Sequence, residues 1–265
     1  MTGDCSPAST FPFMSTTTLD SLATALRSAG TVTVLTGAGI STDSGIPDFR
    51  GPNGIWTKDP KAERLSSLQH YMADPELRVQ AWQTRLNHPS RDAKPNAAHH
   101  ALVDLERKGK LHALITQNID GLHRAAGTSP DITIEIHGTM REVVCMSCGD
   151  RAPMERALDR VRAGEQDPPC KTCGGILKSA TISFGQNLVP GDLDRAQRAA
   201  ETCDLFIAVG TSLTVLPVAY LPQIAVSSGA DVAILNAEPT PYDDLARWVL
   251  REPLSAGIPA LVRAL

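Results

Sequence analysis

Thr31-Val-Thr-Val-Leu-Thr-Gly-Ala-Gly39 decides the predicted fold, because a strand rich in β-branched residues runs directly into two closely spaced glycines. A strand followed by glycines is typical of the opening of a dinucleotide-binding site. The first glycine allows a tight turn, and the second lets the backbone approach a pyrophosphate. The third glycine of the usual G-x-G-x-x-G pattern is missing, since Gly37-Ala-Gly-Ile-Ser-Thr42 matches only its first half, so this motif is weak by itself.

Strand-like and helix-like segments alternate along the rest of the chain. Further β-rich segments lie at 113–116, 132–136, 205–209 and 232–235. An amphipathic helix is predicted over 19–29, and another helix-like stretch covers 97–108. This alternation predicts an α/β fold with a Rossmann-like doubly wound parallel sheet that helices cover on both faces. We expect one such NAD-binding domain to be formed by residues 19–142 and 180–265.

Four of the six cysteines form two C-x-x-C pairs that interrupt the alternation. The pairs Cys145-x2-Cys148 and Cys170-x2-Cys173 are separated by 21 residues, which is the layout of a tetrahedral structural zinc site. Four protein sulfurs complete the coordination sphere, so a zinc ion here would stabilise rather than catalyse. A redox or disulfide set is the alternative, and a reducing compartment disfavours it. We predict a zinc-ribbon insert over 143–179.

Length and composition restrict the class of protein. The 265 residues suit one catalytic core with a small appended module, and 42% hydrophobic with 20% charged residues is typical of a globular protein. A net charge of −4 gives no excess of positive charge, which a nucleic-acid-binding protein would be expected to carry. No secretory signal and no apolar run of membrane-spanning length is present, so we expect a cytoplasmic protein without a membrane partner. Residues 1–18, rich in Ser, Thr and Pro, are predicted to be a flexible tail.

The segment after the glycines argues against an ordinary hydride-transfer dehydrogenase. Such enzymes carry an acidic residue about 20 positions after the glycines, at the end of the second strand. Here that region is Asp48-Phe-Arg-Gly-Pro-Asn-Gly-Ile-Trp56. Polar and aromatic side chains on a loop that contains several glycines and a proline usually bind a ligand. Taken singly, each of these residues is equally compatible with an ordinary surface loop.

The whole string from Gly37 to Trp56 closely resembles the signature of the sirtuins. The resemblance extends from about Leu19 to Leu265, and its further motifs follow in order as Thr116-Gln-Asn-Ile-Asp-Gly-Leu-His123, His137-Gly138, Gly210-Thr-Ser-Leu213 and Asn236-Ala-Glu238. It implies a Rossmann-type sheet with a small zinc-binding module, in agreement with the reading from the residues. It also implies an NAD-dependent protein-lysine deacylase, with NAD as co-substrate, one structural zinc ion and acylated-lysine proteins as substrates.

The resemblance assigns the catalytic residues. In this family the acyl-lysine oxygen displaces nicotinamide from the ribose, and a histidine then deprotonates the ribose so that the acyl group transfers to it. His137 matches that histidine, whose unperturbed pKa near working pH suits a general base. Asn118 and Asp120 resemble the pair that holds the nicotinamide ribose and a water, and Gln117 would bind the ribose hydroxyls. The predicted catalytic residues are therefore His137, Asn118 and Asp120.

The same resemblance extends to the rest of the NAD site. Asp48 and the backbone at Ile46 would hold the nicotinamide amide, Phe49 would shield the reactive face, and Arg50 would lie near phosphate. Residues after two later strands would bind phosphate and the adenosine ribose. The predicted cofactor-binding residues are Gly37, Ala38, Gly39, Ile46, Asp48, Phe49, Arg50, Gln117, Asn118, Asp120, Gly210, Thr211, Ser212, Asn236 and Glu238.

Two segments resemble the edges between which the family binds its peptide as an extended strand. They predict Phe184, Gly185 and Val215 as substrate-peptide residues. The chain departs from the family at Lys178-Ser-Ala-Thr-Ile-Ser183, where a proline-containing run is usual. It departs again at Arg251-Glu-Pro-Leu-Ser255, which lacks the small residues that usually pack on adenine, so no adenine contact is assigned there.

Three functions fit these residues. The leading one is an NAD-dependent deacylase that releases nicotinamide and O-acyl-ADP-ribose. Protein mono-ADP-ribosyl transfer is the alternative at the same NAD site, and a zinc ribbon that only senses NAD is a third. The Tyr-x-x-Arg pair of sirtuins that remove acidic acyl groups is absent, because Tyr71 is followed by Asp74, Tyr220 by Gln223 and Tyr242 by Leu245. We therefore expect neutral acyl groups to be preferred.

Overall fold

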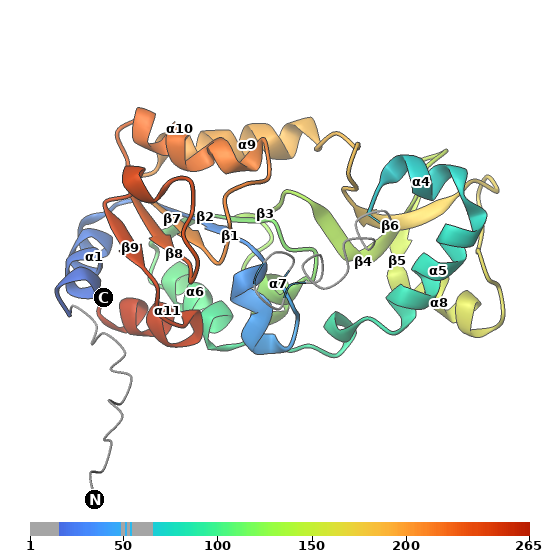
Figure 1. Cartoon of the computed structure of the whole chain (residues 1–265), viewed down its shortest axis with the longest axis horizontal. Coiled ribbons are helices and arrows are strands. Elements are labelled where there is room, and N and C mark those ends of the chain that lie inside the picture. Colours follow the sequence, from blue (N-terminus) through green and yellow to red (C-terminus); the bar gives the residue numbers. More distant parts are fainter. Residues whose placement is uncertain (1–15, 49–50, 52–53, 55–65) are drawn as a thin grey trace, which may run out of the picture.

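A six-stranded parallel sheet forms the centre of the computed structural model, which describes residues 16–48, 51, 54 and 66–265 (Figure 1). The strand order is β3-β2-β1-β7-β8-β9, and every neighbouring pair is parallel. The strands are β1 Val32–Thr36, β2 Leu111–Thr116, β3 Thr133–Glu135, β7 Leu205–Val209, β8 Asp231–Leu235 and β9 Trp248–Leu250. The order changes direction between β1 and β7, and ligands of such sheets bind at that point.

Helices cover both faces of the sheet, as Figure 1 shows. One layer contains α1 Thr16–Ser28, α6 Ala97–Arg107 and α11 Leu254–Arg263, and the opposite layer contains α9 Pro190–Thr202 and α10 Leu221–Ser227. Each layer has its own apolar core against the strands. Within β1, Val32 and Val34 face the first core and Leu35 faces the second. The prediction of a doubly wound α/β fold is confirmed.

A second, smaller sheet of order β5-β4-β6 lies at the other end of the molecule (Figure 1). Its antiparallel strands are β4 Gly138–Cys145, β5 Arg151–Pro153 and β6 Leu177–Thr181, and α8 Met154–Arg162 packs on it. The strand β6 includes the first part of the segment in which the chain departs from the family. The predicted boundaries of the insert, 143–179, stay a prediction.

Two helices from far earlier in the chain pack on this module. They are α4 Leu68–Ala73 and α5 Pro75–Leu86, and the fully buried Trp82 of α5 lies in one core with Val143 and Leu158. Asp167 fixes the contact, because it accepts hydrogen bonds from Arg78 Nε at 2.7 Å and from Trp82 Nε1 at 3.2 Å. The small module is therefore built from two separate stretches of the chain.

Short elements complete the chain between these layers. They are the 3₁₀ helices η1 Ala38–Ser44, η2 Pro89–Arg91, η3 Val218–Tyr220 and η4 Asp243–Leu245, together with the helix α7 Leu122–Ala126. The helix α1 begins at Thr16, inside the segment predicted as tail, whereas residues 1–15 lie outside the described residues. Among the described helices, none is long and apolar enough to cross a bilayer.

Two histidines pack together in the interior. His99 of α6 and His123 of α7 are 0% and 2% exposed, and their ring centroids are 4.8 Å apart. Burial lowers the pKa of His99 to about 4 and that of His123 to about 3, so both rings are neutral in the folded protein at neutral pH. His123 Nε2 lies 2.9 Å from the hydroxyl of Thr36, the last residue of β1. The pair therefore supports the end of the central strand.

We expect the free energy of unfolding to fall as the pH drops below about 6.5. Between that ordinary histidine pKa and the lowered folded values, the unfolded chain binds protons that the folded chain does not bind, so acid favours unfolding. Each histidine then lowers the free energy of unfolding by about 1.4 kcal/mol per pH unit between about pH 6.5 and pH 4. Urea unfolding at several pH values in this window measures the slope.

His99→Gln is the matched control. Glutamine at this third helical position still closes a capping box with Asn96, and it does not titrate. The variant should lose about half of the slope contributed by the pair, since one of two titrating rings remains. A slope equal to that of the wild type would contradict the assignment to these histidines.

Candidate active site

Two glycine-containing loops meet where the strand order changes. A β-carbon on Gly37 would lie 2.7 Å from the carbonyl oxygen of Gly210, and one on Gly39 would lie 2.8 Å from the Gly210 Cα. Gly210 itself has φ +58°, a left-handed conformation that favours glycine. The amide of Gly39 also donates to the Gly210 carbonyl at 2.9 Å. The predicted glycines are thus needed for the close approach of the loops that follow β1 and β7.

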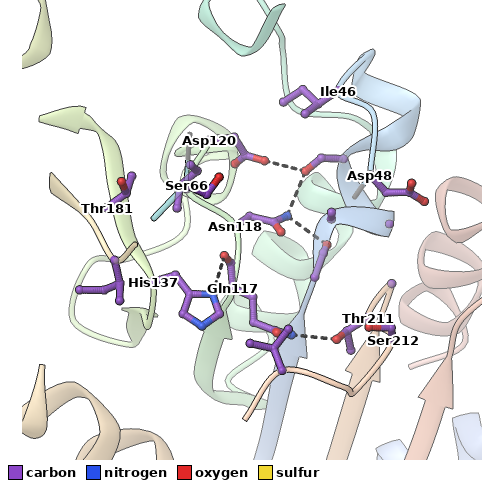
Figure 2. Close-up of a pocket in the computed structure, with 18 of the residues that line it drawn as sticks. Ile46, Asp48, Ser66, Gln117, Asn118, Asp120, His137, Thr181, Thr211 and Ser212 are labelled. Atoms are coloured by element: carbon purple, nitrogen blue, oxygen red, sulfur yellow. Dashed lines mark hydrogen bonds between the residues drawn. The ribbon is translucent and has the colours of Figure 1, made fainter. Parts of the chain in front are cut away.

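The segment after Gly37 forms the 3₁₀ helix η1, which a network of polar side chains fixes to the loop after β2 (Figure 2). The Ser41 hydroxyl donates to Asp120 Oδ2 at 2.8 Å. Asn118 Nδ2 donates to the Gly37 carbonyl at 3.0 Å and to Ser41 Oγ at 3.2 Å. All three side chains are buried, at 8% exposure or less. Ser41 lies within the glycine-containing string, and no local pattern indicates its role.

The Asp120 carboxylate has both oxygens engaged. Besides Ser41, it accepts from the amide of Leu122 at 2.8 Å. Its backbone carbonyl accepts from Arg141 Nε at 2.9 Å. Asp120 therefore orients the loop from 117 to 122 and the start of η1 relative to each other.

His137 lies across the cavity from this network, in the turn directly before β4 at the start of the small module (Figure 2). Its Nδ1 is 3.2 Å from the carbonyl oxygen of Gln117, so Nδ1 carries the proton and Nε2 keeps a free lone pair. Burial lowers the pKa of His137, and the bond to Gln117 acts in the opposite direction. Gln117 Nε2 in turn donates to Thr211 Oγ1 at 2.8 Å. The predicted base is thus connected through Gln117 to the loop after β7.

One cavity of about 1250 Å³ joins these groups. It is lined by the following predicted site residues: Gly37, Ala38, Gly39, Ile46, Asp48, Gln117, Asn118, Asp120, His137, Phe184, Gly185, Gly210, Thr211, Ser212, Val215, Asn236 and Glu238. Phe49 and Arg50 lie outside the described residues. The Asp48 carboxylate accepts from the amide of Gly51 at 3.0 Å and points away from Asn118 in Figure 2. A volume of this size suits a ligand as large as a dinucleotide.

The end of the cavity near β8 is organised by backbone carbonyls. Asn236 Nδ2 donates to the Glu238 carbonyl at 2.8 Å, so this amide group is turned onto its own loop. Arg251 donates to the carbonyls of Asn236 and Glu238 at 2.8 and 3.1 Å and forms an ion pair with Asp243. The Glu238 side chain is exposed.

The Phe184 backbone already has partners from the small module. Its amide donates to the Ser66 carbonyl at 2.8 Å, and its carbonyl accepts from the Leu68 amide at 3.0 Å. Phe184 is 40% exposed, and Leu216 at the other wall of the cavity is 59% exposed. A peptide between these walls would therefore use the Phe184 side chain rather than its backbone.

The four predicted zinc ligands lie together. The sulfur atoms of Cys145, Cys148, Cys170 and Cys173 all fall within 4.8 Å of one another. Cys145 and Cys173 are 3.5 Å apart, and Cys148 and Cys170 are 3.8 Å apart. These distances exceed the length of a disulfide bond, about 2.05 Å, and agree with the roughly 3.8 Å between sulfurs that each lie about 2.3 Å from a tetrahedral zinc. The donor set and its geometry fit a structural zinc ion.

The amino-acid sequence is similar to proteins of one family. A model of the Sir2 family matches residues 37–217. The chain is 53% identical over 234 residues to the NAD-dependent protein deacetylase 2 of Streptomyces coelicolor, covering 88% of this chain and 97% of that protein. It is 43% identical over 254 residues to the NAD-dependent protein deacetylase of Haloarcula marismortui, covering 94% and 95%.

Solved structures agree with these relatives. A Sir2 structure with a deacetylated p53 peptide and 3'-O-acetyl ADP-ribose is 34% identical with a TM-score of 0.83, covering 93% of this chain and 96% of that chain. A second Sir2 structure is 36% identical with a TM-score of 0.84, covering 94% and 97%. The chain therefore belongs to the Sir2 family, as its resemblance to the sirtuins predicted.

Proposed function

We propose that this protein is an NAD-dependent protein-lysine deacetylase that uses NAD as co-substrate and a structural zinc ion. The observation that carries the proposal is the single cavity that joins the two glycine-containing loops to His137, Phe184 and Val215. This cavity offers room for a dinucleotide and an acyl-lysine side chain at the same time. Relatives over nearly the whole chain are NAD-dependent protein deacetylases.

His137 is the proposed general base. Its Nδ1 proton is held by the Gln117 carbonyl, which leaves Nε2 free to accept a proton from a ribose hydroxyl. The lowered pKa of the buried ring keeps it neutral at working pH. NAD supplies the ADP-ribosyl group that receives the acyl group after nicotinamide leaves. Because the pKa of His137 is lowered, the rate should fall only at a pH below the ordinary histidine value of about 6.5, where the buried ring becomes protonated.

Asn118 and Asp120 are proposed to shape the inner end of the cavity. Through Ser41 they hold the start of η1 against the loop after β2, so the walls around the nicotinamide are preorganised. Ser41 joins them as a positioning residue, because its hydroxyl connects both side chains. The loops at Gly37–Gly39 and Gly210–Ser212 are proposed to bind phosphate, and Asn236 with Glu238 the adenosine ribose.

The four cysteines are proposed to hold zinc for stability alone. A site closed by four sulfurs leaves no position for substrate. Such thiolates persist in a reducing compartment, which supports the proposed cytoplasmic location. The proposed partners are acylated-lysine proteins, and the net charge of −4 favours neither nucleic acid nor an anionic membrane.

One experiment separates the candidate functions. The protein is incubated with NAD and acyl-lysine peptides, and free nicotinamide and deacylated peptide are both measured. Equal amounts of the two products support deacylation. A mass increase on the target with no deacylated product would instead establish ADP-ribosyl transfer, and no nicotinamide release at all would leave only an NAD-sensing role.

Acetyl-lysine is expected to be used more efficiently than succinyl-lysine. The helix α5 carries Gln83 and no tyrosine, and its Arg85 guanidinium lies 5.3 Å from the centre of the Tyr71 ring and 5.0 Å from that of the Trp82 ring. To pair with a succinyl carboxylate, this guanidinium would have to leave both aromatic rings. Each of these cation–π contacts is worth about 0.5–2 kcal/mol. Catalytic efficiencies on acetyl and succinyl versions of one peptide test the prediction.

Arg85 is the residue to vary as a control, because it lines the cavity and its buried Nη1 has no hydrogen bond within the described part of the chain. Arg85→Met keeps the aliphatic packing and removes the charge. A succinyl efficiency equal to or above the acetyl value in the wild type would overturn the prediction. Loss of that activity in Arg85→Met would then identify the guanidinium as its cause.

A further inference from the structure

The end of the cavity proposed to hold the substrate peptide carries one charged side chain among its described lining residues. Two segments, 184–194 and 215–217, line this end. They contribute mainly apolar side chains, among them Phe184, Leu193 and Leu216. The exposed Asp194 is the single charged residue that the two segments add to the described lining. The mouth of the proposed peptide site is therefore negatively charged at one point.

The carboxylate of Asp194 is not used inside the protein. It makes no hydrogen bond or ion pair with any residue that the structure describes. Arg198 lies one helical turn further along α9, where an i,i+4 ion pair could form, and no such pair is present in this part of the chain. The charge at the cavity mouth therefore has no partner among the described side chains.

Asp194 is also not required to begin its helix. Acidic residues stabilise a helix chiefly from its first turn. In α9, which begins at Pro190, Asp192 occupies that turn and also pairs with Arg195 at 3.5 Å. Asp194 lies beyond the first turn, and α9 starts at the end that faces the small module (Figure 1). Stabilisation of the helix end therefore does not account for this carboxylate.

We propose that Asp194 is a specificity-determining residue, which selects protein substrates that carry an arginine or lysine close to the acyl-lysine. This inference rests on the proposed deacetylase function and names its class of substrate. Opposite charges across an interface favour the matching partner, and the like charge of an acidic sequence disfavours it. An extended peptide points successive side chains to opposite sides, so only alternate positions on one flank of the acyl-lysine should face Asp194.

Steady-state kinetics with a set of peptides tests the assignment. Each peptide has one acetyl-lysine, neutral flanks and a single Arg, Gln or Glu at one flanking position. At the position that meets Asp194, the wild type should use the Arg peptide about two- to fivefold more efficiently than the Gln peptide, the range of an exposed ion pair. The Glu peptide should be used least efficiently. Raising the salt to about 1 M, where the Debye length is about 3 Å, should remove most of this preference.

Substitutions at Asp194 should change the ratio between these peptides. Asp194→Asn should give equal efficiencies for the Arg and Gln peptides, and Asp194→Lys should reverse the order so that the Glu peptide is preferred. Asp192→Asn is the matched control, because it removes the same charge from a neighbouring residue that is not part of the described cavity lining. It should keep the wild-type ratio, which separates a local contact from the net charge of the protein.

The outcomes distinguish this inference from the function on which it rests. Equal efficiencies of the wild type for the Arg and Glu peptides at every position, or an unchanged ratio in Asp194→Asn, would overturn the inference while deacetylation itself stood. If no peptide of the set yielded either nicotinamide or deacetylated product, the proposed function would fall, and the inference with it.

Discussion

His137→Ala is expected to stop acyl removal while leaving binding of ADP-ribose largely intact. General-base catalysis is worth about 10²- to 10⁴-fold, and the deacylation rate should fall by that factor. His88 is the other imidazole in the described cavity wall, and its Nδ1 accepts a hydrogen bond from the Ser90 amide at 3.2 Å, so its Nε2 carries the proton and offers no lone pair. Deacylated peptide and nicotinamide are followed together in single-turnover mixtures.

His88→Ala is the control for this variant. His88 also lines the cavity and also has a pKa lowered by burial, but it has no proposed part in proton transfer. It should keep most of the activity. Deacylation by His137→Ala within about threefold of the wild-type rate would remove the assignment of the base, since even the weakest general-base contribution exceeds that factor.

Local patterns predicted five of the six strands of the large sheet and the grouping of four cysteines. The strand at 205–209 was predicted with the bounds that the structure gives, because five consecutive buried apolar residues carry that information in themselves. The four cysteines are likewise readable from spacing alone. By contrast, the three-residue strand β9 was not predicted, and α11 contains Gly257 and Pro259, which obscure a helical pattern.

Contacts between residues that are far apart in the chain could not be predicted from the sequence. Ser41 and Asp120 are 79 positions apart, and only the fold brings the hydroxyl to the carboxylate. Trp82, from a helix far earlier in the chain, is buried in the core of the small module. The backbone of Phe184 is likewise paired with the distant residues Ser66 and Leu68. Each of these depends on sheet order and packing, which no local window records.

The second large effect is expected from Cys145→Ser, which should release zinc and destabilise the protein. Zinc binding by thiolates contributes directly to folding, with apparent values of about 10–16 kcal/mol in isolated zinc fingers. Each kcal/mol lowers the melting temperature by roughly 2–4 °C in a chain of this size, so a fall of more than about 10 °C is expected. Metal analysis and thermal melting measure the two effects. Cys203→Ser, which changes a buried cysteine outside the cluster, should keep the metal.

Cys145→Ser should also reduce deacylation, although the cysteine cluster lies at the far end of β4 from His137. The strand β4 begins directly after His137 and ends at Cys145, and the Ile182 amide donates to the His137 carbonyl at 2.8 Å. At the next position Gly138 packs so closely on β6 that a β-carbon there would lie 2.1 Å from the Ala180 carbonyl. Loss of zinc loosens β4 and β6 together, and with them the backbone that holds the proposed base. A variant that kept one zinc per chain, an unchanged melting curve and full activity would show that Cys145 is not part of this support.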